Sequence, residues 1–456
     1  MFTMNRAYPF LRSFSTSCVH RTKCWPRPDY GPMEVQRSKL MNGIRVACAS
    51  PMGAPIAACT IMFQAGSRFE CDDQIGVTHF LRACSAASGS GYTAYSKTRV
   101  LQQFGAYITC SSDRQSIAYT LRCPVSVFCT VKYYLLDIAA RCSYNQWEID
   151  DRKPMIKTDL QRIHPEQLCM DLVQKACWGG PLNNSIFCEE ERIDGMSESS
   201  LNAFTKENFT TDECTVSSVG LPFEEVIMLA EKIEYKREPP PPRRVPPSIA
   251  RHGFEFYDYG PNSDTWIAFA VPGCGTTDLP CLMTHSLIAA SCGTGNVQMG
   301  QHSQDRTPQG PLGLMARDIF TDLKAFNVSY YDTGIFGILV RTRSATACEA
   351  AVIASNFLQS LGSLDCCHIQ VGKQRLKTEL AIHDDDCVRV SEGLALQSAS
   401  NQQIDSASTS MCMVDLITPD EAICVAKTLA CKRDLMAMAV VGDVQAVPHD
   451  RELLKA

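Results

Sequence analysis

A proline-rich segment at residues 237–247 divides this chain of 456 residues into two halves of similar length. Proline fixes its backbone φ angle and lacks an amide hydrogen, so the segment forms neither a helix nor a central strand. We expect an extended polyproline spacer, with a proline-motif ligand as the alternative. The chain is also too long for a single hydrophobic core, which favours two domains.

Short motifs recur in the same order on both sides of this segment, at an offset of about 220 residues. A Lys-Thr-acid-Leu sequence begins at Lys157 in the first half and at Lys377 in the second. A histidine follows each of them, His164 and His383. A repeated order at a constant offset is typical of a duplicated domain. Because the two histidines occupy matching positions, we interpret both as structural residues.

The end of each half repeats a second pattern, a capped helix followed by a strand. Ser197 and Thr418 each begin a sequence typical of a helix N-cap, and a proline follows Thr418. Residues 214–219 and 436–441 then have the composition of strands, and each strand ends at a glycine. The chain is therefore expected to contain two copies of one domain.

Within the first half, the apolar pattern separates strands from helices. The predicted strands are 43–49, 57–63, 107–110 and 116–123, and the predicted helices are 76–87, 98–104, 125–142 and 167–178. Strands and helices in separate blocks favour an α+β fold. We expect two duplicated domains, each an antiparallel sheet covered by helices, that face each other across the proline-rich linker.

The N-terminal segment has the composition of a mitochondrial transit peptide. Its first 28 residues contain no acidic residue but several basic ones, namely Arg6, Arg12, Arg21, Lys23 and Arg27. The sequence around Arg12 favours cleavage after Phe14, and a basic disordered tail is the alternative. The predicted bounds are 1–30 for the transit peptide, 35–237 for the N-terminal domain, 238–249 for the linker and 250–453 for the C-terminal domain.

Composition narrows the classes of partner. The net charge is -6 and the pI is near 5.9, and lysine and arginine are spread along the chain, which argues against nucleic acid. No window approaches the roughly 20 apolar residues that a membrane-spanning helix needs. We therefore expect membrane association only through partner subunits.

The chain is rich in cysteine, with 24 residues, but contains no Cys-x-x-Cys pair. This spacing argues against a zinc ribbon or a thioredoxin-type site. Many of the cysteines lie in apolar runs, as Cys59, Cys123 and Cys424 do. We interpret them as small buried hydrophobic residues that stay reduced, and a redox-active pair at Cys366 and Cys367 is the alternative.

Residues 76–83, Gly-Val-Thr-His-Phe-Leu-Arg-Ala, match an inverted zinc peptidase motif that has lost its chemistry. That motif, His-x-x-Glu-His, needs two zinc ligands one helical turn apart and a glutamate that polarises the bound water. Here His79 is present, but Arg82 replaces the glutamate and Ala83 replaces the second histidine. Asp159 is the remaining plausible carboxylate ligand. Since catalytic zinc needs three protein ligands, we expect no metal, catalytic or cofactor-binding residues in this chain.

Three segments carry a resemblance to the pitrilysin-type zinc peptidase family. They are residues 63–70 with 76–81, residues 326–337, and the strand that closes the second half at Gly442. Together with the duplicated plan, the resemblance covers most of the chain beyond residue 35. It implies a peptidase-like shape without the reaction, because the zinc motif is degenerate.

Within this family the chain resembles the core proteins of mitochondrial respiratory complex III. The resemblance implies a structural subunit on the matrix side of the inner membrane, with a core protein 1 homologue and other subunits of that complex as partners. One alternative is the α-type subunit of the matrix processing peptidase, whose mark is a glycine-rich loop. Here that loop is sparse in glycine between Gly293 and Gly310. Another alternative is a free matrix protein that binds extended peptides.

Overall fold

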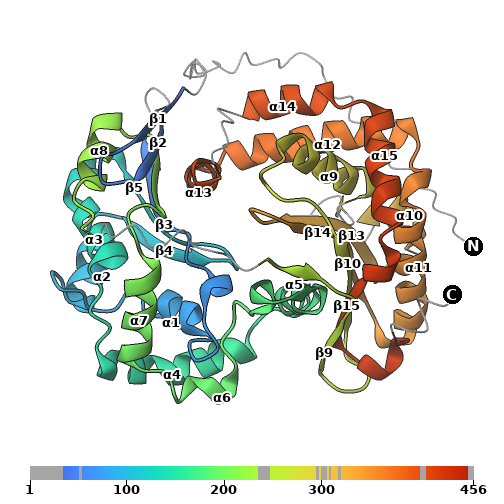
Figure 1. Ribbon diagram of the computed structural model, residues 1–456, viewed down its shortest axis with the longest axis horizontal. Helices are drawn as coiled ribbons and strands as arrows, with labels where there is room; N and C mark the ends of the chain where they lie inside the picture. The colour runs from blue at the N-terminus through green and yellow to red at the C-terminus, as the bar shows by residue number, and fades with distance from the viewer. Residues whose placement is uncertain are drawn as a thin grey trace, which may run out of the picture.

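The computed structural model describes residues 34–50, 54–234, 247–293, 297–298, 306–307, 310–316, 320–400 and 407–449. The predicted transit peptide and the proline-rich segment up to residue 246 lie outside these residues, as does most of the segment between Gly293 and Gly310. The described residues form two halves that face each other, each with a sheet and its own helices (Figure 1).

The first half is built on a six-stranded sheet in the order β1-β2-β7-β3-β5-β4. The strands are β1 (Val35–Lys39), β2 (Arg45–Ala49), β3 (Ile56–Phe63), β4 (Tyr107–Ser112), β5 (Ile117–Pro124) and β7 (Cys214–Val219). Strand β7 is buried along its whole length, as expected for an inner strand of a sheet covered on both faces. These bounds confirm the strands predicted from the sequence of this half.

The second half contains a five-stranded sheet in the order β13-β14-β10-β15-β9. Its strands are β9 (Phe254–Asp258), β10 (Thr265–Pro272), β13 (Asp322–Ser329), β14 (Gly334–Thr342) and β15 (Ala437–Gly442). Read from β9, this order repeats that of the first sheet read from β2. The predicted duplication is therefore confirmed, with β3 and β10 as counterparts at the centre of their sheets.

Each sheet departs from the predicted antiparallel arrangement at one pair of strands. Strand β2 runs parallel to β7, and β9 runs parallel to β15, while the other named pairs of both sheets are antiparallel. Parallel neighbours need a long crossover connection, and a long helical stretch precedes both β7 and β15. Short strand pairs also occur, β6 (Trp178–Gly179) with β8 (Ile249–Ala250) and β11 (Val297–Gln298) with β12 (Arg306–Thr307).

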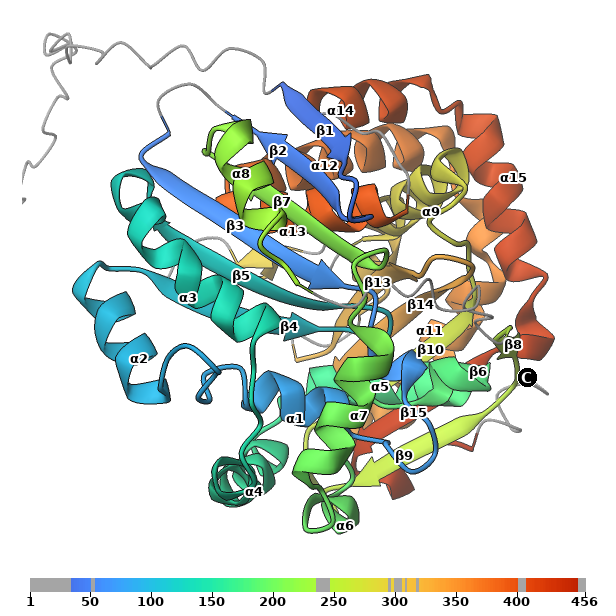
Figure 2. The same cartoon turned by 60° about the vertical axis from the view of Figure 1, so that its left-hand side comes forward.

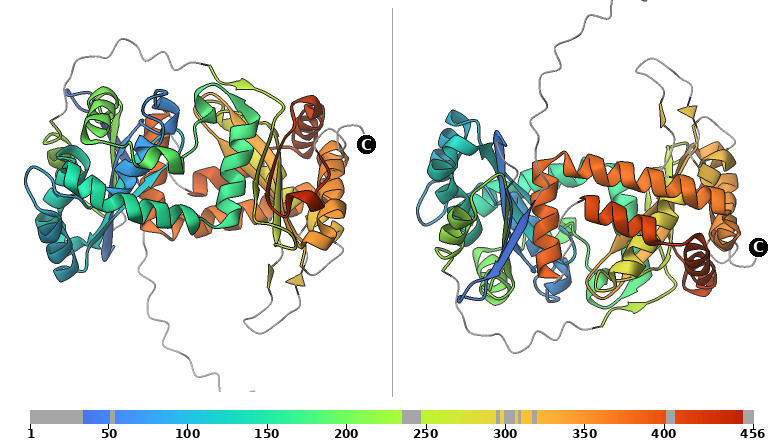
Figure 3. Two further views of the ribbon diagram at one scale, coloured as in Figure 1. Left: turned by 90° about the horizontal axis from the view of Figure 1, so that it is seen from below. Right: turned by 90° about the horizontal axis from the view of Figure 1, so that it is seen from above.

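Helices lie mostly on the outer side of each half, as the views from below and above show (Figure 3), and one helix from each half lies between the two sheets. In the first half they are α1 (Val77–Ala83), α2 (Ala94–Gln103), α3 (Phe128–Ala140), α4 (Gln146–Gln161), α5 (Pro165–Cys177), α6 (Glu190–Ile193), α7 (Glu198–Asn208) and α8 (Phe223–Ala230). In the second they are α9 (Leu279–Cys292), α10 (Gly310–Met315), α11 (Ala347–Gln359), α12 (Cys366–Asp384), α13 (Cys387–Ala399), α14 (Ala407–Leu416) and α15 (Pro419–Ala430). Among the described helices, none has the length and apolar character needed to cross a bilayer.

The helix boundaries follow local capping. Helix α2 begins four residues earlier than predicted, because the Thr93 side chain accepts a hydrogen bond from the amide of Ser96. Both predicted N-caps of the repeat are confirmed. Ser197 accepts from the amide of Ser200, and Thr418 forms a reciprocal capping box with Glu421.

Each half contributes one helix that packs on the sheet of the other half. Helix α5 of the first half packs on β9, β10 and β15, whereas α13 of the second half packs on β2, β3 and β7 (Figure 2). Val173 and Trp178 join a core cluster with Ala439 of β15, and Leu394 of α13 joins one with Ala47 of β2. Each sheet therefore buries its inner face against a helix from the other half, which makes the halves one packed unit.

The cysteines of the described residues are all free thiols. Cys59 and Cys123 are buried, as predicted. The prediction is wrong for Cys424, which is exposed, because the apolar run of α15 covers the core with only one side of the helix. Cys366 and Cys367 are both exposed at the start of α12.

Candidate functional site

The degenerate zinc motif forms helix α1, whose start is fixed by a buried carboxylate. The side chain of Glu70 accepts hydrogen bonds from the amides of Gly76 and Thr78, at 2.9 and 2.8 Å, and from the Thr78 hydroxyl at 2.7 Å. It thus satisfies amides that a helix start leaves without partners. Gly76 has a φ of +93°, and a Cβ there would lie 2.5 Å from the sulfur of Cys188. The sequence around α1 is therefore tightly constrained for structural reasons.

His79 is buried in α1, with 6% of its surface exposed. Its Nδ1 accepts a hydrogen bond of 3.1 Å from the amide of Cys188, and its ring meets that of Phe187 edge-on. Burial, followed by the charge of Arg82, lowers the pKa of His79 to about 4. The imidazole is therefore neutral at pH 7, with its proton on Nε2.

Arg82 occupies the place of the catalytic glutamate and brings a cation to it. The Nη1 of its guanidinium donates to the hydroxyl of Ser112 at 2.5 Å, and its Cζ lies 5.9 Å from the centre of the Phe187 ring. Burial lowers the pKa of Arg82, whereas Cys110, Asp159 and Asp171 favour its charged form. A guanidinium stays protonated in proteins, so Arg82 neither accepts a proton nor attracts a divalent metal. Ala83 packs against the core and offers no ligand.

The other residues singled out from the sequence lie in different settings. Asp159 is exposed on α4 and acts on Arg82 electrostatically, so the structure brings this carboxylate near the motif. His164 caps α5 by accepting a hydrogen bond from the amide of Glu166. His383 is an exposed residue of α12. The matching repeat positions thus carry different structural roles.

Sequence reasoning missed a group of buried polar residues that join the halves beside α1. Arg114 and Asp171 form an ion pair of 2.7 Å, and both side chains are almost fully buried. The Arg114 charge acts on Tyr330 of the second half, whose hydroxyl also donates to Gln174. Burial raises the pKa of Tyr330 to about 12, so its hydroxyl stays protonated. Tyr330 lies in the segment 326–337 that carried the family resemblance, but its contacts with the first half had no sequence signal.

A second set of contacts closes the gap between the halves at the same place. Arg68 donates two hydrogen bonds to the carboxylate of Asp332, at 2.7 and 2.6 Å, and the amide of Tyr331 donates to the side chain of Gln115 at 2.8 Å. A cavity of about 130 Å³ remains between the halves, lined by Gln115 and Tyr330 among others. Ligand pockets usually measure roughly 300–1,000 Å³, so this cavity is smaller than a typical one.

The fold and the site together define a peptidase-like protein without a peptidase's reacting groups. Residues 45–190 match the family described as insulinase, peptidase family M16, and residues 195–365 match the domain described as the peptidase M16 inactive domain. The chain belongs to peptidase family M16, which confirms the family resemblance. With Arg82 and Ala83 in the motif, it is a degenerate homologue and not an active peptidase.

Relatives extend over nearly the whole chain. Cytochrome b-c1 complex subunit 2 of Homo sapiens is 23% identical, covering 99% of this chain and 100% of the relative. The mitochondrial-processing peptidase subunit alpha of Solanum tuberosum is 22% identical, covering 93% and 85%. The processing peptidase subunit beta of Blastocladiella emersonii is 23% identical, covering 93% and 92%. The chain is therefore similar both to a subunit of the cytochrome b-c1 complex and to subunits of the mitochondrial processing peptidase.

Proposed function

We propose that this chain is a non-catalytic core subunit of mitochondrial complex III, of the core protein 2 type. In this role it lies on the matrix side of the inner membrane and pairs with a core protein 1 homologue. It serves as a scaffold for the subunits that carry electrons from ubiquinol to cytochrome c. It contributes no cofactor and no reacting group of its own.

The observation that carries this proposal is the end-to-end similarity to a cytochrome b-c1 subunit. The match covers 99% of this chain and 100% of the human relative, whereas the α subunit from Solanum tuberosum is covered over 85%. This favours the same kind of assembly.

The closed arrangement of the halves supports a scaffold over a peptide-binding role. Helices α5 and α13 cover the inner faces of the sheets, and the contact of Arg68 with Asp332 fastens the halves beside α1. A presequence-binding subunit needs a free groove or sheet edge at this place. Among the described residues, the cavity beside Gln115 and Tyr330, about 130 Å³, is smaller than a typical ligand pocket.

The test identifies the protein complex with which the full-length chain is associated in mitochondria. We would tag the chain, solubilise the membranes in mild detergent, and separate complexes on a native gel stained for haem. We expect the chain to migrate with b- and c-type cytochromes, and a core protein 1 homologue to be identified in the same band. Migration apart from the cytochromes contradicts the proposal.

The α-type processing subunit is the second candidate, and the relatives named as processing peptidase subunits favour it. A processing assay on the purified chain with its partner separates the two functions. Presequence cleavage that is lost when this chain is omitted supports the second candidate. A free peptide-binding protein would instead bind a presequence peptide in the absence of any partner, which an anisotropy titration detects.

A further inference from the structure

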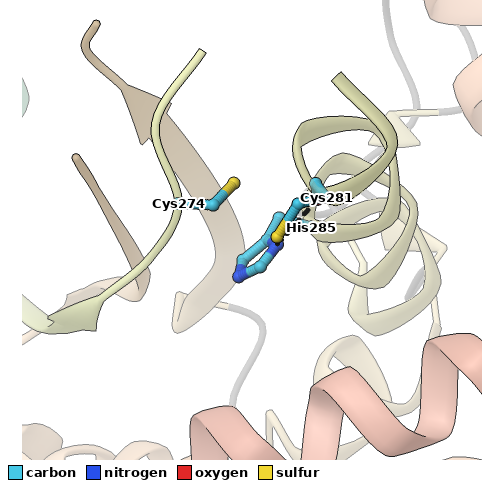
Figure 4. Close-up of side chains that lie close together, drawn as sticks. All are labelled: Cys274, Cys281 and His285. Carbon is cyan, nitrogen blue, oxygen red and sulfur yellow. Dashed lines mark hydrogen bonds between the residues drawn. The ribbon is translucent and has the colours of Figure 1, made fainter. Parts of the chain in front are cut away.

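A second group of metal-ligating side chains lies in the other half of the molecule. Cys274 follows β10, and Cys281 and His285 lie one turn apart on α9 (Figure 4). Since β10 is the counterpart of β3, the connection from β10 to α9 corresponds to the connection from β3 to α1. The group therefore occupies, in the second half, the position that the degenerate zinc motif occupies in the first.

The three side chains already lie at distances suited to a shared ion. One ligand atom from each residue lies within 4.8 Å of the others, and the Cys281 sulfur is 3.6 Å from Nδ1 of His285. Tetrahedral zinc, with Zn–S of about 2.3 Å and Zn–N of about 2.0 Å, separates its sulfur and nitrogen ligands by about 3.5 Å. Binding thus needs small side-chain movements and, for ligation through Nδ1, loss of the hydrogen bond from this nitrogen to the Cys281 carbonyl oxygen.

Both segments that carry these ligands are anchored. Backbone hydrogen bonds of 2.7 Å hold the Cys274 loop to the β13–β14 hairpin, from Gly273 to Gly334 and from Thr276 to Tyr330. On the helix side, Asp278 caps α9 by accepting a hydrogen bond from the amide of Cys281. An anchored ligand set loses little conformational freedom when it binds an ion.

The charge balance also suits a divalent cation bound by two thiolates. His285 is buried, with 4% of its surface exposed. Nδ1 of this ring donates a hydrogen bond of 2.8 Å to the Cys281 carbonyl oxygen, because a carbonyl oxygen only accepts, so zinc binding through Nδ1 breaks this bond and moves the proton to Nε2. Two thiolates and one Zn²⁺ sum to zero charge, which a half-buried site tolerates.

We propose that Cys274, Cys281 and His285 bind a zinc ion, with water at the fourth position. The ion links the loop after β10 to the start of α9 and thereby stabilises the second half. The site is independent of the degenerate motif on α1. Its ligand set, two cysteines and one histidine, is a recognised one for zinc with an open position.

The test uses the purified full-length chain, reduced and stripped of metal. Titration with Co²⁺ should saturate at one equivalent and produce a thiolate-to-metal charge-transfer band, which Zn²⁺ then removes. Zn²⁺ alone should raise the melting temperature. Cys281→Ser and His285→Gln should each lose the band and the shift, while Cys348→Ser, at an exposed cysteine outside the group, should keep both.

Two results would overturn the site. One is a wild-type chain without a charge-transfer band at micromolar Co²⁺. The other is a band that persists in both ligand variants, because the metal then binds elsewhere. Circular dichroism of each variant checks that it is folded, and having two separate ligand variants keeps the test decisive if one of them does not fold.

Discussion

The connection from β3 to α1 and the connection from β10 to α9 are counterparts in the duplicated fold, yet they carry different chemistry. The first presents one histidine beside an arginine, and Asp171 of the buried Arg114–Asp171 ion pair acts on that arginine. The second presents two thiols and a buried histidine. The comparison shows that the arrangement of strand, connection and helix does not depend on a catalytic metal. Helix caps and core packing stabilise it in both halves.

The largest expected effect comes from restoring metal ligands to α1. In a Cys281→Ser background, which removes the proposed second site, Arg82→Glu alone should bind no zinc, because at most two ligands are then present. Arg82→Glu combined with Ala83→His is the smallest change expected to regain binding, up to one equivalent with Asp159 as the third ligand. Elemental analysis after dialysis measures this. Equal zinc content in the single and the double variant would contradict our account of α1.

The next effect concerns the charges around α1. Asp171→Ala should lower the free energy of unfolding by about 3–5 kcal/mol, because Arg114 is then left buried without its partner. Asp194→Ala is the matched control, since its pair with Lys157 is exposed and should change stability by less than about 1 kcal/mol. Urea denaturation compares the two. Similar losses in both variants would show that burial of the ion pair does not increase its effect on the free energy of unfolding.

His79 gives a smaller, pH-dependent effect. Its pKa is about 4 in the folded chain and near 6.5 when unfolded, so between these values only the unfolded chain gains a proton. Stability should therefore fall by about 2 kcal/mol between pH 7 and pH 5 through this residue. His79→Asn should remove that part of the pH dependence, and His383→Asn, at an exposed histidine, should retain it. Parallel urea curves at the two pH values test this.

The smallest effect compares the equivalent caps of the two halves. Thr418→Ala should cost about 1 kcal/mol, because it removes the hydroxyl oxygen that accepts from the amide of Glu421 in the capping box. Ser197→Ala removes the cap bond of 3.4 Å from the amide of Ser200 together with hydroxyl contacts to Ser199 and Ser200, and should cost about 0.5 kcal/mol. Denaturation midpoints measure both. A larger loss at Ser197 would reverse the expected order.

Much of the frame could be predicted from local sequence. The strands before Gly220 and Gly442 and the caps at Ser197 and Thr418 depend on a few adjacent residues, and the structure confirms them. Helix α4 was missed, because Pro154 interrupts its pattern. The exchange of α5 and α13 could not be predicted, since an apolar helix face does not specify which sheet it meets.

The two sites were harder to predict than the strands and helices, because some of their residues are far apart in the sequence. His79, Arg82 and Ala83 could be recognised because the motif is contiguous. Cys274 and Cys281 are separated by a loop, and only the folding of that loop against the β13–β14 hairpin brings their sulfurs together. The contact of Arg68 with Asp332 likewise depends on how the halves face each other. Contacts between distant segments need the three-dimensional arrangement.

The central claim is that α1 keeps the form of a zinc peptidase helix but not its reaction. The most direct test incubates the isolated chain with a fluorogenic presequence peptide and Zn²⁺, with and without a chelator. The Cys281→Ser variant is measured in parallel to exclude a contribution from the second half. We predict no chelator-sensitive hydrolysis by either protein. Chelator-sensitive cleavage by both would contradict the account.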